Sequence, residues 1–341
     1  MRYFFHFLTF AVISLTTSSC GILLDIYESQ QDYLSPQHVL EANNKYEVAW
    51  NLSDIQVADG FRTPAIVGSP GKIIVEGWRK EDNFSSAFFG LNSNNGEVLW
   101  KIIGSNGDSF IVNDNALYRG TVGNATLYAY HTENGELFWA TRLPLSHSTM
   151  EIYLAENKIF VNTSDSKFFV LNENGEILDD FQISSRTFLV LDGVLYMEDA
   201  YTLKAVELSS KQDIWLLEIG KSNTHAPIFD NGEIFLRTRL TPAKIYSIDQ
   251  YTGKVNWMIT QDVLSNLCVL GDKIYFTSPD GYLISINRYS GEEISRVMFS
   301  PQFDLDKQIG EYFIACDAIN NVIAVSFGDN TQIMGLKIIN P

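Results

Sequence analysis

The chain has 341 residues, 45% of them hydrophobic and 13% aromatic, so it is long enough to bury a large core. Acidic residues outnumber basic ones by 41 to 24, giving a formal net charge of -17. Such a surface repels nucleic-acid phosphates and fits either simple solubility or contact with a basic partner. Three cysteines are too few for a disulfide-rich scaffold or a cysteine-based zinc or iron–sulfur site.

The first 19 residues are predicted to be a signal peptide. Arg2 is followed by an apolar run, Tyr3 to Leu15, which at about 13 residues is too short to span a bilayer comfortably. Small polar residues then lead to Cys20, and this arrangement resembles a bacterial lipoprotein processing site, although Thr17 stands where that family usually has Leu. The resemblance implies a lipid on Cys20, and Gly21 in place of Asp implies transport to the outer membrane. An ordinary cleaved signal peptide is the alternative, and it too exports the chain.

Residues 20–44 are rich in Gln, Asn and Ser and are predicted to form the anchor and a tether. From residue 45 to 341 the sequence repeats. One position holds Trp50, Trp100, Trp139, Asp179, Trp215, Trp257 and Ser295 in turn, at spacings of 36 to 50 residues. A repeat of about 40 residues with strand character is typical of a β-propeller.

Each repeat contains the same series of strands. Two apolar strands joined by a tight Asp-, Asn- or Gly-containing turn form a hairpin, as in "SFIVNDNALYRGT" from Ser109. A third strand follows, then a turn, then the fourth strand with the Trp. The turn carries a glycine that is expected to supply a positive φ, and the Trp is expected to pack between neighbouring blades. The turn glycines are Gly96, Gly135, Gly175, Gly253 and Gly291.

The strand count predicts an all-β, seven-bladed propeller of four-stranded antiparallel blades. Seven hairpins and seven third strands are present, but the last repeat ends at Pro341 without a fourth strand. "KYEVAWNL" from Lys45 reads as a fourth strand without a repeat before it, so it is expected to complete the last blade and close the ring. Eight blades is the alternative, if Pro301 to Gly310 contains a further strand.

The repeat resembles that of the pyrroloquinoline-quinone-type propeller family, with "KIYSIDQYTGKVNW" among the best copies. The resemblance covers roughly residues 45 to 340. It implies one of two branches: quinone-dependent dehydrogenases, or non-catalytic exported lipoproteins such as the BamB-like proteins of outer-membrane assembly. The dehydrogenases carry two adjacent cysteines over the cofactor, and this chain has no such pair. The BamB branch is therefore expected, although its members have eight blades.

Two further groups of residues are candidate sites. Cys268 and Cys316 fall on the first strands of successive repeats; two buried, unpaired side chains are expected, with a disulfide between neighbouring blades as the alternative. His147 and His225 each precede a first strand, and with Glu151 they have the ligand types that zinc prefers. Two separate loop histidines are the favoured interpretation.

No hydrolase, phosphate-loop, metalloprotease or dinucleotide motif occurs in the sequence. The sequence therefore predicts no catalytic, cofactor-binding or metal-binding residue. The expected function is that of a monomeric, non-catalytic scaffold that binds another envelope protein, is held to the membrane by its anchor alone, and faces the periplasm from the outer membrane. A periplasmic or secreted soluble protein is the alternative location. An enzyme or a small-ligand or saccharide binder that uses the central funnel is the alternative function.

Overall fold

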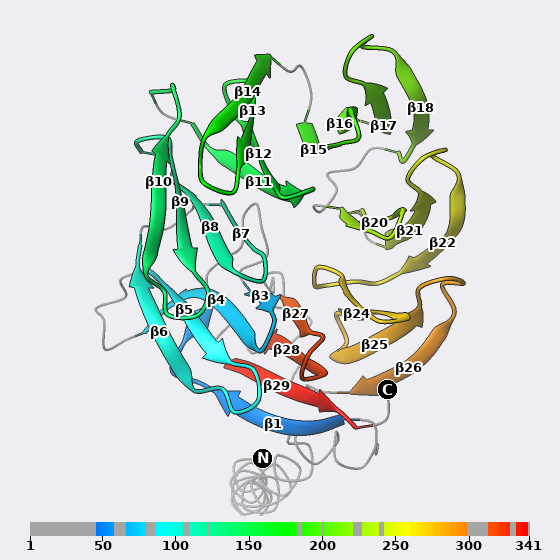
Figure 1. Cartoon of the computed structure of the whole chain (residues 1–341). Helices are drawn as coiled ribbons and strands as arrows, with labels where there is room; N and C mark the ends of the chain where they lie inside the picture. Colours follow the sequence, from blue (N-terminus) through cyan, green and yellow to red (C-terminus); the bar gives the residue numbers. More distant parts are fainter. Residues whose placement is uncertain are drawn as a thin grey trace, which may run out of the picture.

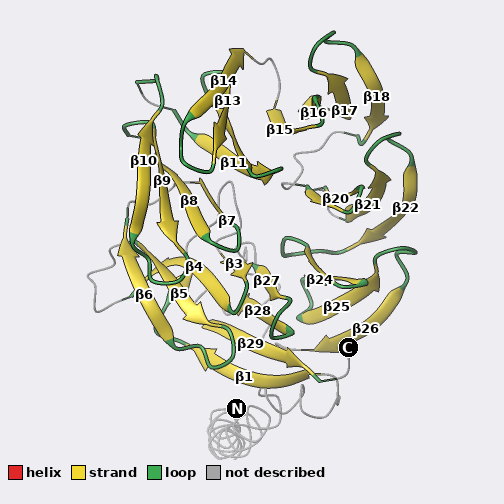
Figure 2. Cartoon of the chain, in the orientation of Figure 1, coloured by secondary structure: helices red, strands yellow, loops and turns green. Residues whose placement is uncertain are grey.

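The computed structural model describes residues 46–57, 66–79, 86–104, 109–121, 123–146, 148–182, 186–199, 201–220, 227–238, 242–298, 313–327 and 332–339. Regular structure in these ranges consists of strands without helices, arranged in seven antiparallel sheets around a ring (Figures 1 and 2). The predicted all-β, seven-bladed propeller is therefore confirmed.

The blades follow the chain, and each contains four strands ordered from the inside of the ring outward. Blade 1 has β3 (Ile66–Ser69), β4 (Lys72–Trp78), β5 (Ala87–Asn92) and β6 (Val98–Ile103), with β2 (Gln56–Val57) also paired to β4. Blade 2 has β7 (Ser109–Val112), β8 (Ala116–Thr121), β9 (Thr126–His131) and β10 (Leu137–Arg142). Blade 3 has β11 (Met150–Ala155), β12 (Lys158–Thr163), β13 (Lys167–Asn172) and β14 (Ile177–Gln182).

Blades 4 to 7 repeat the arrangement. Blade 4 has β15 (Arg186–Leu191), β16 (Val194–Asp199), β17 (Thr202–Glu207) and β18 (Asp213–Glu218). Blade 5 has β19 (Ile228–Asp230), β20 (Glu233–Arg237), β21 (Ala243–Asp249) and β22 (Val255–Gln261). Blade 6 has β23 (Cys268–Leu270), β24 (Lys273–Thr277), β25 (Tyr282–Asn287) and β26 (Glu293–Met298). Blade 7 has β27 (Ile314–Asp317), β28 (Val322–Phe327), β29 (Gln332–Ile338) and β1 (Tyr46–Leu52).

The two ends of the folded chain meet in blade 7. Strand β1 pairs antiparallel with β29, from Tyr46 opposite Ile338 to Leu52 opposite Ile333. Blade 7 is therefore built from both ends of the sequence, as the orphan fourth strand at Lys45 predicted, and the blue and red strands lie together in Figure 1. This pairing joins the last blade to the start of the first, so the ring closes through hydrogen bonds.

Direct contacts between blades 6 and 7 exclude a blade between them. The amide of Asn266, just before β23, donates to the carbonyl of Ile314 on β27 at 2.8 Å and accepts from its N–H at 3.0 Å. Residues 301 to 310, on which the eight-blade alternative depended, lie outside the described residues. Because the flanking blades already touch, no further blade fits at this position, and the BamB-like branch's eight-blade pattern is not followed here.

Burial explains why the inner strands are so apolar. In blade 1, Ile73, Ile74 and Val75 on β4 are fully buried because the strand is covered on both faces by neighbouring blades. Successive side chains point to opposite faces of a strand, so a strand covered on both faces needs consecutive apolar residues. The outer strands are more exposed: β22 alternates more and less buried positions, and β14 is exposed at most positions.

All seven outer strands carry a β-bulge, which no sequence pattern predicted. The register slips by one residue immediately before each Trp position, for example between Leu137 and Trp139 on β10. The bulged residue is left unpaired, and several are large and exposed, such as Leu99, Phe138 and Ile214. A bulge increases twist and interrupts the ladder, so it protects an open edge strand against pairing with another chain.

The predicted signal peptide, lipid anchor at Cys20 and tether fall within residues 1–45, which lie outside the described residues. In the part of the chain that is described, no helix has the length and apolar character needed to cross a membrane.

Candidate functional site

The recurring tryptophans lie at the joints between blades. Each indole Nε1–H donates to a backbone carbonyl in the third-to-fourth-strand turn of the next blade, at 2.6 to 3.0 Å. The pairs are Trp50 with Ser93, Trp100 with Thr132, Trp139 with Glu173, Trp215 with Gln250 and Trp257 with Arg288. Each ring therefore ties its own blade to the next one by a hydrogen bond as well as by packing.

The turn glycines receive these rings. Gly96, Gly135, Gly175, Gly253 and Gly291 all have φ between 69° and 82°. A Cβ built on any of them would fall 2.5 to 3.1 Å from the Trp ring of the preceding blade, and at Gly175 it would also fall 2.7 Å from the Thr141 hydroxyl. The sequence predicted the positive φ, but it did not reveal that the same glycine must also lack a side chain to admit the neighbouring indole.

Two joints lack a Trp and are built differently. Asp179 occupies the position on β14, and the matching turn of blade 4 has Lys211 at φ 61° in place of glycine, with its amine over the Phe181 ring at 5.3 Å. Ser295 occupies the position on β26 and hydrogen-bonds Ser285 at 2.7 Å and the Tyr46 hydroxyl at 3.4 Å. Tyr46 of blade 7 thus reaches blade 6 where an indole is missing.

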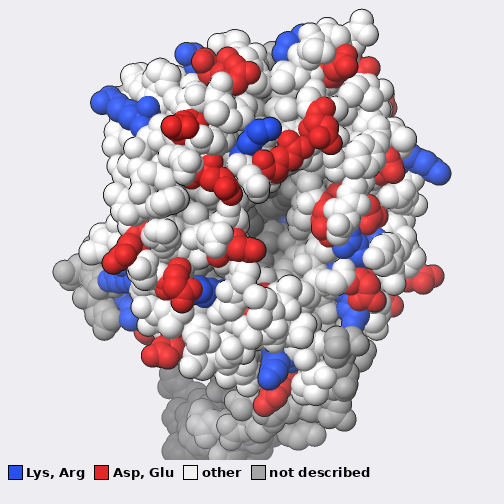
Figure 3. Space-filling model, in the orientation of Figure 1, with Lys and Arg blue, Asp and Glu red and all other residues white. Residues whose placement is uncertain are grey.

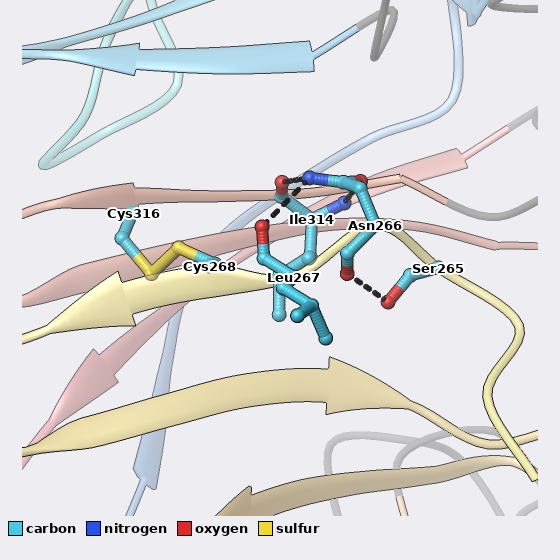
Figure 4. The surroundings of a disulfide bond; sticks show 6 residues. All are labelled: Ser265, Asn266, Leu267, Cys268, Ile314 and Cys316. Carbon is cyan, nitrogen blue, oxygen red and sulfur yellow. Dashed lines mark hydrogen bonds between the residues drawn. A yellow bond between two sulfur atoms is a disulfide. The ribbon is translucent and has the colours of Figure 1, made fainter. Parts of the chain in front are cut away.

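The joint between blades 6 and 7 also contains a disulfide. Cys268 on β23 and Cys316 on β27 are bonded, with their Cα atoms 6.1 Å apart (Figure 4). Beside it lies the paired amide of Asn266 described above. Of the two alternatives for these cysteines, the structure has the disulfide rather than two unpaired side chains.

The zinc-site alternative at His147, His225 and Glu151 is only partly covered by the described residues. His147 and His225 lie outside the described residues, and Glu151 on β11 accepts a hydrogen bond from the Tyr153 hydroxyl at 3.1 Å. Within the residues that the structure describes, no group of three or more His, Cys, Asp or Glu side chains is placed to hold a metal ion.

A groove between blades 2 and 3, lined by described residues, is a concave surface that could hold a ligand. It consists of two adjoining hollows of about 400 and about 200 Å³ that share Asn113, Tyr118 and Glu173. The larger hollow extends to the β9–β10 turn and Phe138, and the smaller one to the β11–β12 turn at residues 156–158. Turns from two blades thus form its walls, and the inner strands hold them in place.

Tyr118 forms the floor shared by the two hollows. The residue is 2% exposed, and its ring centroid lies 6.0 Å from that of Trp139, the indole that joins the two blades. Burial raises the pKa of the Tyr118 hydroxyl; a hydrogen bond from the Asn113 amide at 3.5 Å opposes the rise and the nearby Glu173 carboxylate adds to it. The hydroxyl is therefore protonated at neutral pH and presents a neutral polar group to the groove.

Carboxylates surround this floor, and they fall into two kinds. Glu133 is paired with Lys72 at 2.6 Å, and Glu156 is 3.5 Å from Lys158. The side chains of Asp114 and Glu173 have no ion-pair or hydrogen-bond partner among the residues that the structure describes. The groove therefore offers two unpaired negative charges.

Aromatic rings complete the wall of the larger hollow. The rings of His131 and Phe138 are in tilted contact, with centroids 4.8 Å apart, and Phe138 is 50% exposed although it is large and apolar. The lining combines hydroxyl, amide, carboxylate and aromatic groups, which can bind and orient a ligand. Sequence reasoning missed this groove because its residues come from five separate segments of two repeats and form no motif.

The wider surface is acidic as well. Figure 3 shows Asp and Glu side chains gathered around the central hollow on the face it draws, with fewer Lys and Arg among them. This distribution agrees with the net charge of -17 and favours cationic over anionic ligands on that face.

Comparison with solved structures supports the architecture. A chain in the crystal structure of the mitotic checkpoint complex is 10% identical, covers 85% of this chain and 91% of its own length, and has a TM-score of 0.61. BamB from Moraxella catarrhalis is 12% identical, covers 86% of each chain and has a TM-score of 0.48. At 10% identity, the likeness to the checkpoint-complex chain concerns the fold alone. Comparison with curated protein sequences gives no match.

A protein-family model also matches this sequence. The model described as outer membrane protein assembly factor BamB matches residues 88–295, which span from β5 to β26. The matched segment contains four of the five indole joints described above, and it covers more than half of the sequence. The chain therefore belongs to the BamB-like, pyrroloquinoline-quinone-repeat propeller family.

Proposed function

We propose that the protein is an exported, lipid-anchored, non-catalytic scaffold that binds another envelope protein during outer-membrane protein assembly. The observation that carries this proposal is the match of residues 88–295 to a family described as an outer-membrane assembly factor. A closed ring of seven blades suits such a role, because rigid blades hold their turns in fixed positions for contact with a partner.

Two features support the location. Cys20 follows an apolar segment of signal-peptide length, and a lipid on its thiol would hold the propeller at a membrane. The Cys268–Cys316 disulfide fits an oxidising compartment such as the periplasm, since disulfides are rare in the reducing cytosol. Gly21 after the modified cysteine favours the outer membrane as the destination.

The non-catalytic part of the proposal rests on chemistry. The quinone-dependent relatives use two adjacent cysteines, whereas Cys268 and Cys316 are bonded to each other across two blades. The groove between blades 2 and 3 holds no activated nucleophile–base pair among its described residues, and its polar groups suit binding.

In-cell crosslinking followed by gentle solubilisation and mass spectrometry tests the proposal. The full chain is compared with a form that keeps the signal and anchor, residues 1–44, fused to an unrelated folded domain. Cys20→Ser serves as a second control, because it removes the lipidation site and leaves the propeller intact. Recovery of outer-membrane assembly proteins with the full chain and not with the anchor-only form is expected.

The outcomes separate the parts of the proposal. If Cys20→Ser leaves the protein in the membrane fraction, the lipid anchor is wrong. If the full chain is recovered alone, or with the same proteins as the anchor-only form, the assembly role is wrong.

A further inference from the structure

We propose that the groove between blades 2 and 3 binds a basic side chain, arginine or lysine, presented by an extended segment of a protein partner. This inference rests on the proposed function only in assuming that the partner is a protein. It names the surface and the chemistry of the contact, neither of which follows from membership of the family.

The shape of the groove fits an extended segment. Its two hollows adjoin at Tyr118 and run from the β9–β10 turn of blade 2 to the β11–β12 turn of blade 3. A single side chain can enter the larger hollow, of about 400 Å³, while the neighbouring residue of the same segment lies over the smaller one. Both hollows are open to solvent at the surface, so entry requires no opening of the blades.

The charges of the groove select a cation. Asp114 and Glu173 line the larger hollow with carboxylates that lack partners within the described structure, and Glu173 lines both hollows. The Tyr118 hydroxyl oxygen, in the lining of both hollows, can also accept from an N–H donor. A guanidinium or ammonium group would pair with these carboxylates, whereas an anionic ligand would be repelled by them.

The aromatic side chains in the wall of the larger hollow also favour a basic side chain as the ligand. The exposed ring of Phe138, in tilted contact with His131, can pack against the aliphatic stem or the guanidinium plane of an arginine. Aromatic rings also bind sugars, but a neutral saccharide would leave the two unpaired carboxylates without a countercharge. A basic peptide satisfies the rings and the carboxylates together.

The test measures binding of a fluorescein-labelled peptide, Ser-Arg-Ser-Gly-Arg-Ser, to the purified full chain without its signal peptide. The same peptide with glutamine in place of arginine shows whether charge is required. The groove variant is Asp114→Asn combined with Glu173→Gln. Its matched control is Asp179→Asn with Asp180→Asn, which removes the same two charges from exposed positions on β14. Urea unfolding of each variant verifies that the propeller remains folded.

The groove variant is expected to weaken arginine-peptide binding about tenfold, or about 1.4 kcal/mol, as two partly exposed ion pairs would. The control variant is expected to change it by less than about twofold, and the glutamine peptide to bind no better to wild type than to the groove variant. Equal weakening by both variants would mean that only the total charge matters, and would overturn the proposal. So would tight binding of the glutamine peptide, or displacement of the arginine peptide by maltotetraose.

The same groove variant, tested in the membrane crosslinking experiment, separates this inference from the proposed function. Loss of the recovered partner in the groove variant and not in the control supports both. Full recovery of the partner in the groove variant keeps the assembly role and rejects the groove as its binding surface. Arginine-peptide binding at the groove without any recovered partner keeps the cation site and rejects the assembly role.

Discussion

Gly253→Ala tests why a glycine recurs in the third-to-fourth-strand turns. Gly253 has φ 69°, and a Cβ added there would lie 2.5 Å from the Trp215 ring of blade 4. The comparison variant is Gly193→Ala in the β15–β16 turn, where φ is 76° and nothing lies within 4 Å of the added atom. Both substitutions impose the same kind of backbone strain, but only the first presses on an indole.

The structure gives the size of the difference. An alanine at positive φ costs about 1 to 2 kcal/mol, and this cost applies to both variants. At Gly253 the ring must also move by about 1 Å to reach a normal carbon–carbon separation. Such overpacking costs about 1 to 3 kcal/mol, and the displaced indole loses part of its 3.0 Å bond to the Gln250 carbonyl, worth about 1 kcal/mol. Gly253→Ala should therefore destabilise the protein by about 2 to 3 kcal/mol more than Gly193→Ala.

Urea unfolding followed by circular dichroism and tryptophan fluorescence measures this difference. Gly→Ala also lowers the entropy of the unfolded chain, but by a similar amount at both positions, so this effect cancels in the comparison. If the two variants lose the same free energy of unfolding within about 0.5 kcal/mol, the ring contact does not explain the glycine. The repeated Gly would then be a requirement of the turn alone.

Three further predictions concern the joints between blades. Trp257→Phe should destabilise by about 2 to 4 kcal/mol in urea unfolding, because it removes ring contacts and leaves the Arg288 carbonyl without its 2.7 Å donor; a loss below about 1 kcal/mol would contradict this. Replacing Cys268 and Cys316 together by alanine should lower the free energy of unfolding by up to about 4 kcal/mol, because the disulfide closes a loop of 48 residues. Dithiothreitol should lower the urea midpoint of the wild type and leave that of the variant unchanged. Burial raises the pKa of Tyr46 above 10.0, so stability should be full below pH 10 and fall as the pH rises through the folded pKa. Tyr46→Phe should make that alkaline decline shallower, and an unchanged pH profile would refute the assignment.

The architecture could be predicted from the sequence because the turns, the inner strands and the fourth strand of the repeat each have a recognisable residue pattern. Turn residues marked the hairpins, apolar runs marked the buried inner strands, and the unpaired fourth strand at Lys45 identified the closure with β29. The bulge before each Trp position left no such signal. Its extra residue can be Leu99, Phe138 or Asn256, so only the register between two paired strands reveals it.

The joints between blades carry a further signal in the sequence. Where blade 3 has Asp179 in place of Trp, the receiving turn of blade 4 has Lys211 in place of glycine, although φ there is still 61°. With no indole pressing on the turn, a side chain is sterically allowed, and only the backbone strain of about 1 kcal/mol remains. The loss of a Trp in one repeat thus permits the loss of a Gly in the next, a dependence visible only when strand and turn are compared between successive blades.

The groove between blades 2 and 3 could not be predicted in this way, because no sequence relationship between successive repeats marks it. Asp114 and Glu173 occupy turn positions that are acidic or polar for ordinary reasons, and it is the ring that places them around Tyr118.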